Sequence, residues 1–515
     1  MKFRLALFVA AASGFIALSY EILWYRLYAF VTQGAPIAFG VLLGFYLIGI
    51  ALGSYRSQQY CDAGGVETAR RALGRFLFLA NAVAFLVAPV MGWTVTLAPW
   101  PLSLGTIVLA TTLLGAVFPL TSHLAIDPDD SAGARLSYLY VANILGSCAG
   151  SLLTGFVAMD HASTREIAVG LAWLGFLLAG AVIVATEPDR TKRWAGLGMV
   201  SAGAVVVSLL SHPSFDQLYE RLLFRGDFTR DTHFAETVEN RSGIINVSKE
   251  GKVFGGGAYD GAFNTQIVHD KNWIVRAYAV SALHPRPKRM LMIGLSSGSW
   301  AKILAAAPGL EHFTIVEINP GYLELIARHE EVAGILTDPK VEIVIDDGRR
   351  WLESHPRESF DAIVMNMTWH WRAHATNLLS QEFVALVKRH LTPGGLFFFN
   401  TTWSTDACKT VQAEFPHTLR VINFVAGSDA PLSIDLTAWR SLLEGYRMDG
   451  RPVLDPTAPE GRDAEEQLVA FMRAGDESAH VEEDTSLRKS CARGEVITDD
   501  NMLPEWRQLL HWEKP

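Results

Sequence analysis

The sequence predicts two parts of different class: a polytopic α-helical membrane bundle at the N-terminus, and a C-terminal α/β domain with a Rossmann-like sheet. Half of the 515 residues are hydrophobic and the mean hydropathy is +0.20, which is high for a water-soluble chain. Long apolar segments occupy the first 212 residues, whereas strand and helix patterns alternate from residue 289 onward. We therefore expect a transmembrane domain over 1–212, a linker and small β region over 213–288, and the Rossmann-like domain over 289–515.

The N-terminal part contains seven segments long enough to cross a bilayer, which takes about 20 mostly apolar residues. They cover roughly 5–25, 36–55, 76–97, 102–125, 137–159, 167–186 and 194–211. Glu21 lies near the end of the first segment, with Arg26 five residues later. The two either form a polar pair inside the bundle or lie at the interface with water. We expect an integral membrane protein of a bacterial inner membrane, with the lipid bilayer as a partner.

Basic residues in the connecting loops fall mostly on one side of the membrane. If seven segments alternate, only Arg26 and Arg165 lie on the second side. The first side carries Lys2, Arg4, Arg56, Arg70, Arg71, Arg75, Arg135, Arg190, Lys192 and Arg193. The positive-inside rule then puts the N-terminus in the cytoplasm, and seven spans would export the C-terminal domain. We expect instead that one segment is miscounted and that the soluble domain is cytoplasmic, because the nucleotide motif described below is the more specific signal.

Charge and cysteine content exclude several classes of function. Residues 1–212 carry 12 Lys+Arg and 10 Asp+Glu, and the rest of the chain carries 32 and 43. An acidic soluble part argues against a nucleic-acid partner, because phosphate binding needs a basic face. The scattered cysteines form no CxxC pair, so we expect neither a disulfide framework nor a zinc site, and no metal. These cysteines are Cys61, Cys148, Cys408 and Cys491.

The soluble part begins with short strand patterns separated by turns at 239–243 and 254–257, which predict a small antiparallel hairpin region. The first strand of the alternating pattern, 289–293, runs into a glycine-rich turn before a helix that begins near Trp300. The turn reads Gly294, Leu295, Ser296, Ser297, Gly298. Such a turn lets a ligand approach the backbone closely. The next strand ends in Glu317, about 20 residues later, where a ribose-binding carboxylate belongs.

Three further strands also end in polar residues, which strengthens the prediction of a nucleoside site. The strand over 341–345 ends in Asp346, Asp347 and Gly348, the strand over 360–365 ends at Asn366, and the strand over 395–400 ends in an asparagine. Asp347 either contacts the base or its exocyclic amine, or caps a helix over 349–354. Strand ends of this kind share the edge where doubly wound sheets bind ligands.

With these residues the chain resembles the spermidine synthase (polyamine aminopropyltransferase) family in its membrane-fused form. The resemblance rests on residues 19–27, 115–120 and 142–146 of the membrane half, and on 259–261, the strand ends and 498–503 of the soluble half. It implies a fold like that of S-adenosylmethionine-dependent methyltransferases, and a pocket for S-adenosylmethionine or its decarboxylated form as substrate. It also implies individual roles: Gly294, Ser296, Ser297 and Gly298 along the methionine-derived chain, Glu317 at the ribose, Asp346, Asp347 and Gly348 around the adenine, and Asn264 where the family often has a nucleoside-contacting glutamine.

The chain departs from the family at two positions that carry its chemistry. Ser297 stands where the glycine loop normally has an aspartate, and Asn366 stands where the catalytic loop normally begins with one. A carboxylate there binds the ammonium group of the acceptor and helps to remove its proton. An amide is neither an anion nor a base, so the polyamine reaction is in question.

The loop after Asn366 supplies other chemical groups. Arg372 could clamp a carboxylate through two parallel hydrogen bonds, which would suit intact S-adenosylmethionine or an acidic acceptor. His370 or His374 could act as a general base near neutral pH. The alternative is that Trp369 and Trp371 are packing residues and the histidines lie on the surface.

The leading hypothesis is a membrane-anchored transferase of spermidine-synthase type that acts on a small-molecule substrate. One alternative is a diverged methyltransferase or lyase acting on intact S-adenosylmethionine. The other is a non-catalytic nucleoside sensor coupled to the bundle. We also allow for a homodimer.

Overall fold

The computed structural model describes residues 1–507 apart from 63–64, 269, 271, 367–368 and 476–479. Met367 and Thr368 of the predicted catalytic loop therefore lie outside the described residues. The chain divides into two compact units, one of Met1–Phe234 with Glu239–Ile244, and one of Ala235–Val238 with Ile245–Pro515. Each unit is described by itself.

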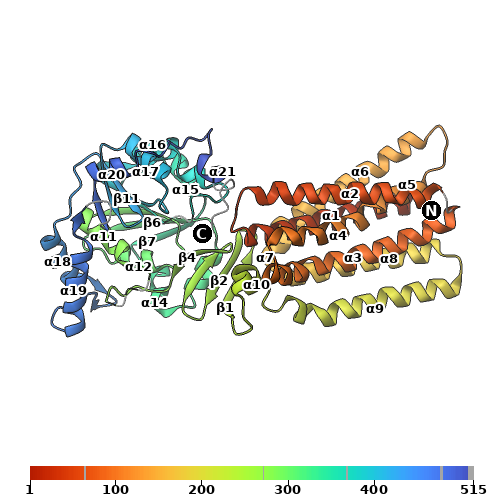
Figure 1. The fold of residues 1–515 in the computed structure, drawn as a ribbon, viewed down its shortest axis with the longest axis horizontal. Helices are drawn as coiled ribbons and strands as arrows, with labels where there is room; N and C mark the ends of the chain where they lie inside the picture. Colours follow the sequence, from red (N-terminus) through yellow and green to blue (C-terminus); the bar gives the residue numbers. More distant parts are fainter. Residues whose placement is uncertain (63–64, 269, 271, 367–368, 476–479, 508–515) are drawn as a thin grey trace. The chain divides into compact units, whose positions relative to one another are not determined.

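The first unit is a helical bundle, and seven of its helical segments are long and apolar enough to cross a membrane (Figure 1). These are Phe3–Val31 (α1), Ile37–Cys61 within α2 (Ile37–Asp62), Gly65–Leu97 (α3), Trp100–Ala125, Ala132–His161, Thr164–Thr186 (α8) and Arg190–Phe215 (α9). The fourth contains α4 (Leu104–Gly115) and α5 (Val117–Ala125), and the fifth α6 (Ala132–Leu153) and α7 (Met159–His161). A short helix, α10 (Leu218–Phe224), follows. The bundle suggests a membrane protein, and the suspected miscount of one segment finds no support.

Small residues bring the backbones of the spanning helices together. A Cβ added at Gly146 of α6 would lie 1.9 Å from the carbonyl oxygen of Ala11 in α1, and one at Gly53 of α2 would lie 1.9 Å from that of Thr112 in α4. These distances leave no room for any side chain. In a bilayer the hydrophobic effect does not drive helices together, because lipid tails are as apolar as the side chains. Close backbone approach of this kind supplies van der Waals packing energy instead.

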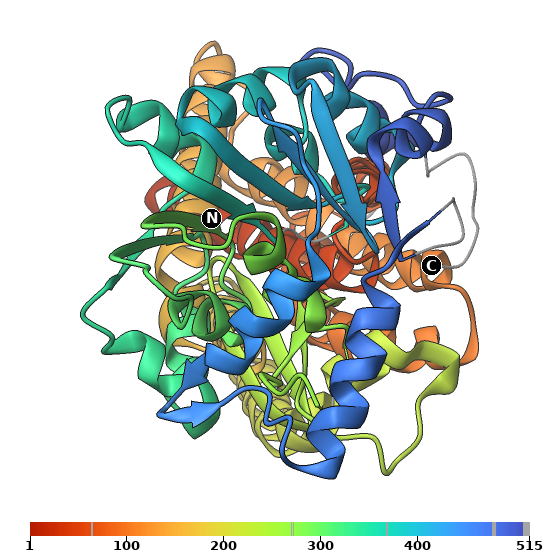
Figure 2. The same cartoon turned by 90° about the vertical axis from the view of Figure 1, so that its left-hand side faces the viewer.

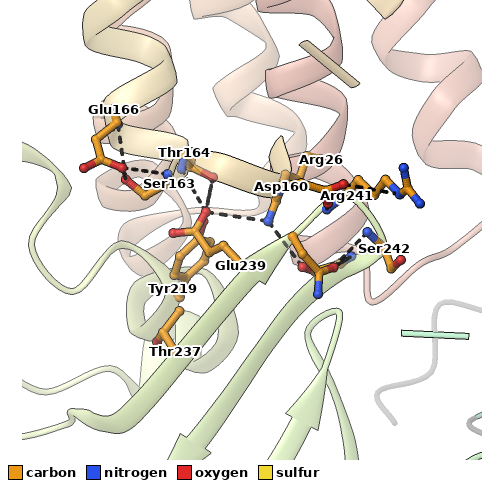
Figure 3. Close-up of polar contacts among 12 residues, drawn as sticks. Arg26, Asp160, Ser163, Thr164, Glu166, Tyr219, Thr237, Glu239, Arg241 and Ser242 are labelled. Carbon is orange, nitrogen blue, oxygen red and sulfur yellow. Dashed lines mark hydrogen bonds and ion pairs between the residues drawn. The ribbon is translucent and has the colours of Figure 1, made fainter. Parts of the chain in front are cut away.

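A carboxylate at the end of β1 (Phe234–Asn240) anchors one end of the bundle (Figure 3). Glu239 Oε2 lies 3.6 Å from Arg26 Nη2, and it accepts hydrogen bonds from Thr164 N at 2.8 Å and Thr164 Oγ1 at 2.6 Å. The Tyr219 hydroxyl donates to Thr164 Oγ1 at 2.7 Å. Arg26 therefore pairs with Glu239 and not with Glu21. Glu239 also satisfies a free N–H at the start of α8, where the helix dipole favours a negative charge.

A small antiparallel sheet has the order β1–β2–β3–β4. Its other strands are β2 (Gly243–Ser248), β3 (Lys252–Gly255) and β4 (Ala258–Ala262). Gly256 and Gly257 join β3 to β4 with φ angles of 55° and 81°. Two successive residues at positive φ form the tight hairpin turn that matches strand twist, and glycine takes this conformation without a steric cost.

The main sheet has nine strands in the order β14–β15–β10–β11–β9–β8–β5–β6–β7. Their bounds are β5 (Arg289–Ile293), β6 (His312–Glu317), β7 (Val341–Ile345), β8 (Phe360–Met365), β9 (Leu391–Asn400), β10 (His417–Val421), β11 (Phe424–Ser428), β14 (Ala474–Gly475) and β15 (Val481–Glu483). Strands β5 to β9 pair in parallel, and β11 pairs with β9 in antiparallel orientation. The chain winds from β5 through β6 to β7 and then returns to place β8 on the other side of β5. The point between β5 and β8 is therefore the topological switch point, where such sheets bind ligands.

Helices cover both faces of this sheet, as Figures 1 and 2 show. Met290 and Met292 of β5 belong to one hydrophobic core, whereas Leu291 and Ile293 belong to the other. The first core includes α11 (Val275–Leu283), α12 (Ser299–Ala305), α13 (Gly321–Ile326), α14 (Glu330–Ala333), α18 (Leu436–Gly445) and α19 (Pro459–Phe471). The second includes α15 (Gly348–Ser354), α16 (Gln381–Arg389), α17 (Thr405–Glu414) and α20 (Asp484–Ser490). A two-stranded pair, β12 (Arg447–Met448) with β13 (Arg451–Pro452), and α21 (Leu503–Arg507) complete the unit. The predicted class, a membrane-type bundle followed by a Rossmann-like domain, is confirmed.

The expectation that no disulfide forms is wrong. Cys408 of α17 and Cys491, just after α20, are both buried and form a disulfide across 83 residues of sequence. Their spacing gives no signal in the sequence, because the packing of α20 against α17 and β10 brings them together. Cys61 and Cys148 are not part of this disulfide.

Candidate functional site

A cavity of about 290 Å³ lies at the switch point of the main sheet. It is lined by Tyr259, Asp260, Gly261, Ala262, Asn272, Trp273, Arg276, Leu295, Ser296, Ser297, Trp300, Asn366, Trp369, Asn400, Thr402, Trp403 and Asn423. Residues from the ends of β5, β8 and β9 thus meet the β3–β4 hairpin and α11. Of the residues predicted from the sequence, the cavity brings together Ser296, Ser297 and Asn366.

The glycine turn that follows β5 has the conformation expected of a ligand-binding turn. Gly294 and Gly298 have φ angles of 89° and 77°, and a Cβ at Gly294 would lie 3.0 Å from the carbonyl oxygen of Asn366. The serine hydroxyls of the turn point to the hairpin. Ser296 Oγ donates to Asp260 O at 2.6 Å, and Ser297 Oγ donates to Ala262 O at 2.9 Å. The serine that replaces the expected aspartate therefore joins two segments of backbone.

Glu317 lies at the end of β6 with its carboxylate against the glycine turn. Its oxygens accept hydrogen bonds from Leu295 N at 2.7 Å and Asn319 N at 2.8 Å. The side chain is buried, and this burial raises the pKa of Glu317 to about 7, opposed by the backbone hydrogen bonds. The position agrees with the predicted end of a strand beside the turn. The ribose role itself stays a prediction.

The residues predicted around the adenine lie at the start of α15. Asp347 accepts a hydrogen bond from Arg350 N at 2.9 Å, which is the helix-capping alternative. Asp346 accepts from Arg350 Nε at 2.6 Å. Gly348 packs on β5, where an added Cβ would lie 2.5 Å from Ile293 Cγ2. The two carboxylates therefore stabilise the strand-to-helix junction.

Asn264 is held by local contacts after β4. Its Nδ2 donates to Asn272 Oδ1 at 3.1 Å, and its Oδ1 accepts from Gln266 N at 3.0 Å. Its backbone N–H donates to Ser299 Oγ at 3.1 Å, beside the glycine turn. The predicted nucleoside contact by this residue stays a prediction.

Arg372 lies beside the β3–β4 hairpin and does not line the cavity. Its Nη1 donates to Gly255 O at 3.2 Å, and its charge faces Asp260. Burial lowers the pKa of Arg372, and the nearby Asp260 and Tyr322 oppose that shift. The Tyr322 hydroxyl donates to the carboxylate of Asp260, whose pKa is raised by burial. Arg372 therefore supports the hairpin, and the predicted substrate clamp stays a prediction.

The two predicted histidines have different surroundings. His370 Nδ1 lies 2.7 Å from Thr402 Oγ1, and burial lowers the pKa of His370. Thr402 lines the cavity at a φ of 47°, a left-handed backbone that costs free energy and is common at functional sites. His374 is exposed, and its backbone N–H donates to Glu505 at 3.0 Å. The structure thus connects His370, but not His374, to the cavity.

Arg276 is the charged residue of the cavity that sequence reasoning missed. It lies on α11, in a segment without any glycine-rich or strand-end signal. Its Nη1 donates to Asn423 Oδ1 at 2.6 Å. Asn423 Nδ2 donates to Asn400 Oδ1 at 2.7 Å, and Asn400 Nδ2 lies 3.4 Å from Asn366 Oδ1. A row of amides therefore connects the cation to Asn366, the position at which the resemblance implies a catalytic aspartate.

Residues 277–417 match the family model described as "Spermine/spermidine synthase domain". The chain is 25% identical over 419 residues to the polyamine aminopropyltransferase of Mycobacterium tuberculosis, covering 77% of each protein. It is 24% identical over 418 residues to polyamine aminopropyltransferase 2 of Streptomyces coelicolor, covering 75% of this chain and 71% of the relative.

A solved structure of spermidine synthase with the transition-state analogue AdoDATO has a TM-score of 0.37 and 15% identity, covering 50% of this chain and 87% of that one. The two sequence matches span three quarters of this chain, which is more than the second unit alone contains. The similarity therefore extends into the helical bundle. The chain is spermidine synthase-like.

Proposed function

We propose that this spermidine synthase-like chain is a membrane-integrated transferase that binds S-adenosylmethionine or its decarboxylated form and transfers a group from the sulfonium to a small-molecule acceptor. The observation that carries the proposal is the cavity at the switch point, where the glycine turn after β5 meets the end of β8. The relatives' names supply the transferase class.

Glu317 is the proposed ribose ligand. A carboxylate offers about four lone-pair positions, and the backbone N–H groups of Leu295 and Asn319 bond to different oxygens of Glu317. Each oxygen therefore keeps a second lone-pair direction that a ribose hydroxyl can approach. The backbone bonds fix the carboxylate before the ligand arrives, so binding costs little side-chain entropy.

The resemblance implies an aspartate at the position of Asn366, so proton removal from the acceptor needs another group here. Asn366 cannot take a proton, whereas the imidazole of His370 can, through the Thr402 hydroxyl that lies 2.7 Å away and lines the cavity. We assign His370 and Thr402 to proton transfer and Asn366 to hydrogen bonding with the substrate.

The proposal places the second unit in the cytoplasm of a bacterium, because S-adenosylmethionine is not expected outside it. The seven spans, the basic residues on the side of Met1, and the disulfide oppose this placement.

Product analysis of the full-length protein in detergent tests the proposal. Incubation with each donor and a mixture of amine and carboxylate acceptors should release methylthioadenosine, seen by mass spectrometry. Adenosylhomocysteine would identify a methyltransferase instead. Methylthioadenosine formed without any acceptor would identify a lyase. Nucleoside binding without any product would support a sensor and contradict the transferase.

A further inference from the structure

We propose that the cavity selects a substrate that carries a carboxylate, and that Arg276 binds it. This deepens the proposed function and rests on it for the nucleoside part of the ligand. The carboxylate has two chemical sources, the amino-acid end of intact S-adenosylmethionine or an acidic acceptor. In both cases the cavity would discriminate against a decarboxylated donor paired with a polyamine.

The charges of the cavity support this choice. Among the described residues that line it, Asp260 is the one carboxylic acid and Arg276 the one basic residue. Asp260 accepts the Tyr322 hydroxyl and faces Arg372, so its carboxylate already has two partners within the protein. The remaining polar lining consists of hydroxyls and amides, including Asn272, Asn366, Asn400 and Asn423. Arg276 thus makes this wall of the cavity positive.

The guanidinium of Arg276 is held in place before any ligand binds. Its Nε donates to Trp273 O at 2.8 Å, its Nη2 to Asn272 O at 2.8 Å and its Nη1 to Asn423 Oδ1 at 2.6 Å. The cation also lies 5.2 Å from the ring centre of Phe424 and 5.9 Å from that of Trp300. A guanidinium has five N–H groups, so these three bonds leave two for a ligand.

Among the described residues, no carboxylate lies within ion-pair distance of Arg276. The carboxylate whose charge acts on Arg276, raising its pKa, is Asp270. Its oxygens accept hydrogen bonds from the backbone N–H groups of Asn272, Ile274 and Val275 at 2.8 to 3.1 Å. These bonds lie at the N-terminal end of α11. A fixed cation with free donors and no ion-pair partner is the arrangement that binds a carboxylate.

Polyamine binding would need the opposite charge. An acceptor that enters as an ammonium meets the cation of Arg276, whereas Asp260, the one carboxylate among the described lining residues, already accepts from Tyr322 and faces Arg372. A decarboxylated donor also offers nothing to the two free N–H groups of Arg276. Intact S-adenosylmethionine, or a nucleoside together with an acidic acceptor, satisfies them.

Calorimetric titrations of the full-length protein in detergent test the proposal. The probes are methylthioadenosine, S-adenosylmethionine, decarboxylated S-adenosylmethionine, and glutarate added with or without methylthioadenosine. If the donor supplies the carboxylate, intact S-adenosylmethionine should bind about tenfold or more tightly than the decarboxylated form. If the acceptor supplies it, the two donors should bind alike and glutarate should bind to the protein.

Arg276→Gln should remove either preference and leave methylthioadenosine affinity unchanged. Arg389→Gln is the matched control, because Arg389 is an exposed residue of α16 that does not line the cavity, and it should behave as wild type. Wild-type protein that binds both donors alike and does not bind glutarate would overturn the proposal even if the variant failed to fold. An unchanged preference in folded Arg276→Gln would overturn it as well. Failure of methylthioadenosine to bind would contradict the proposed function instead, and glutarate alone would still test Arg276.

Discussion

Glu317 shows how a single buried side chain sets the conditions for binding. Its carboxylate is held by two backbone N–H groups, yet burial raises its pKa to about 7. A ribose diol donates hydrogen bonds, so it prefers the ionised form. Under the proposed ribose role, the same residue would determine both nucleoside affinity and its dependence on pH.

Nucleoside affinity should rise with pH through about 7. A pKa near 7 leaves roughly a tenth of Glu317 ionised at pH 6, so methylthioadenosine should bind more weakly there than at pH 8. Calorimetry at pH 6, 7 and 8 measures this change. Glu317→Gln should abolish the pH dependence, and Glu317→Ala should weaken binding by about tenfold or more. Glu311→Gln is the control, because Glu311 is an exposed residue just before β6, and this variant should bind as wild type. Unchanged affinity in Glu317→Ala would contradict the ribose assignment.

The raised pKa of Glu317 also makes the stability of the fold depend on pH. Its contribution to stability falls as the pH rises, whereas nucleoside affinity should rise. A carboxyl whose pKa is higher in the folded than in the unfolded state binds more protons when folded. Its contribution to stability is therefore present below the unfolded value of 4.5 and declines as the pH rises to about 7. Thermal unfolding between pH 5 and pH 8 should show a smaller decline in Glu317→Gln than in wild type. An equal decline in both proteins would contradict the assignment of the shift to Glu317.

Asn366 and Ser297 predict a weak polyamine reaction. General-base assistance is worth about 10²–10⁴-fold in rate, and an amide supplies none. Decarboxylated S-adenosylmethionine with putrescine should therefore give spermidine far below about 1 s⁻¹, an ordinary enzyme rate. Chromatography of the amine products measures this, and Asn366→Asp should raise the rate. Spermidine formation at about 1 s⁻¹ or faster by the wild-type protein would restore the plain family reaction.

At the scale of elements, the end of β1 is fastened to the helical bundle through one ion pair. Arg26 and Glu239 expose only 8% and 14% of their side chains, and Glu239 also holds the first turn of α8 through Thr164. Removal of one partner leaves the other charge buried and unpaired, which costs more than the pair itself contributes.

Glu239→Gln should destabilise the helical unit by about 3 kcal/mol, as the loss of one buried partner typically does. Denaturant unfolding of the protein in detergent, followed by circular dichroism, would measure the change. Glu67→Gln is the control, because Glu67 pairs with Arg71 on the surface of α3, and exposed pairs contribute about 0–1 kcal/mol. Equal effects of the two substitutions would show that the Arg26–Glu239 pair contributes no more than a surface pair.

At the scale of the whole molecule, the direction of insertion decides which substrates the cavity can meet. If all seven candidate spans among the described residues cross the membrane, Met1 and the second unit lie on opposite sides of it, and ten basic loop residues lie on the side of Met1. A disulfide between Cys408 and Cys491 is also typical of compartments outside the cytoplasm. The proposed donor requires the cytoplasm, so topology is the most severe test of the proposed function.

Under the proposed function, a reporter fused after the C-terminus and active only in the periplasm should stay silent. A reporter fused before Met1 provides the reciprocal measurement. A strong periplasmic signal would place the second unit outside, and an S-adenosylmethionine donor would no longer be tenable.

The sequence by itself determined the features that depend on local pattern. Spanning helices follow from runs of apolar residues, and the glycine turn and Glu317 follow from where strands end, so these positions agree with the structure. Features that join distant segments were decided only by tertiary structure. Arg276 bonds to Asn423 across 147 residues, and Cys408 bonds to Cys491 across 83. Arg26 pairs with Glu239 and not with nearby Glu21. Such contacts depend on how strands and helices pack. The periodicity of the sequence does not show which distant side chains this packing brings within hydrogen-bond distance.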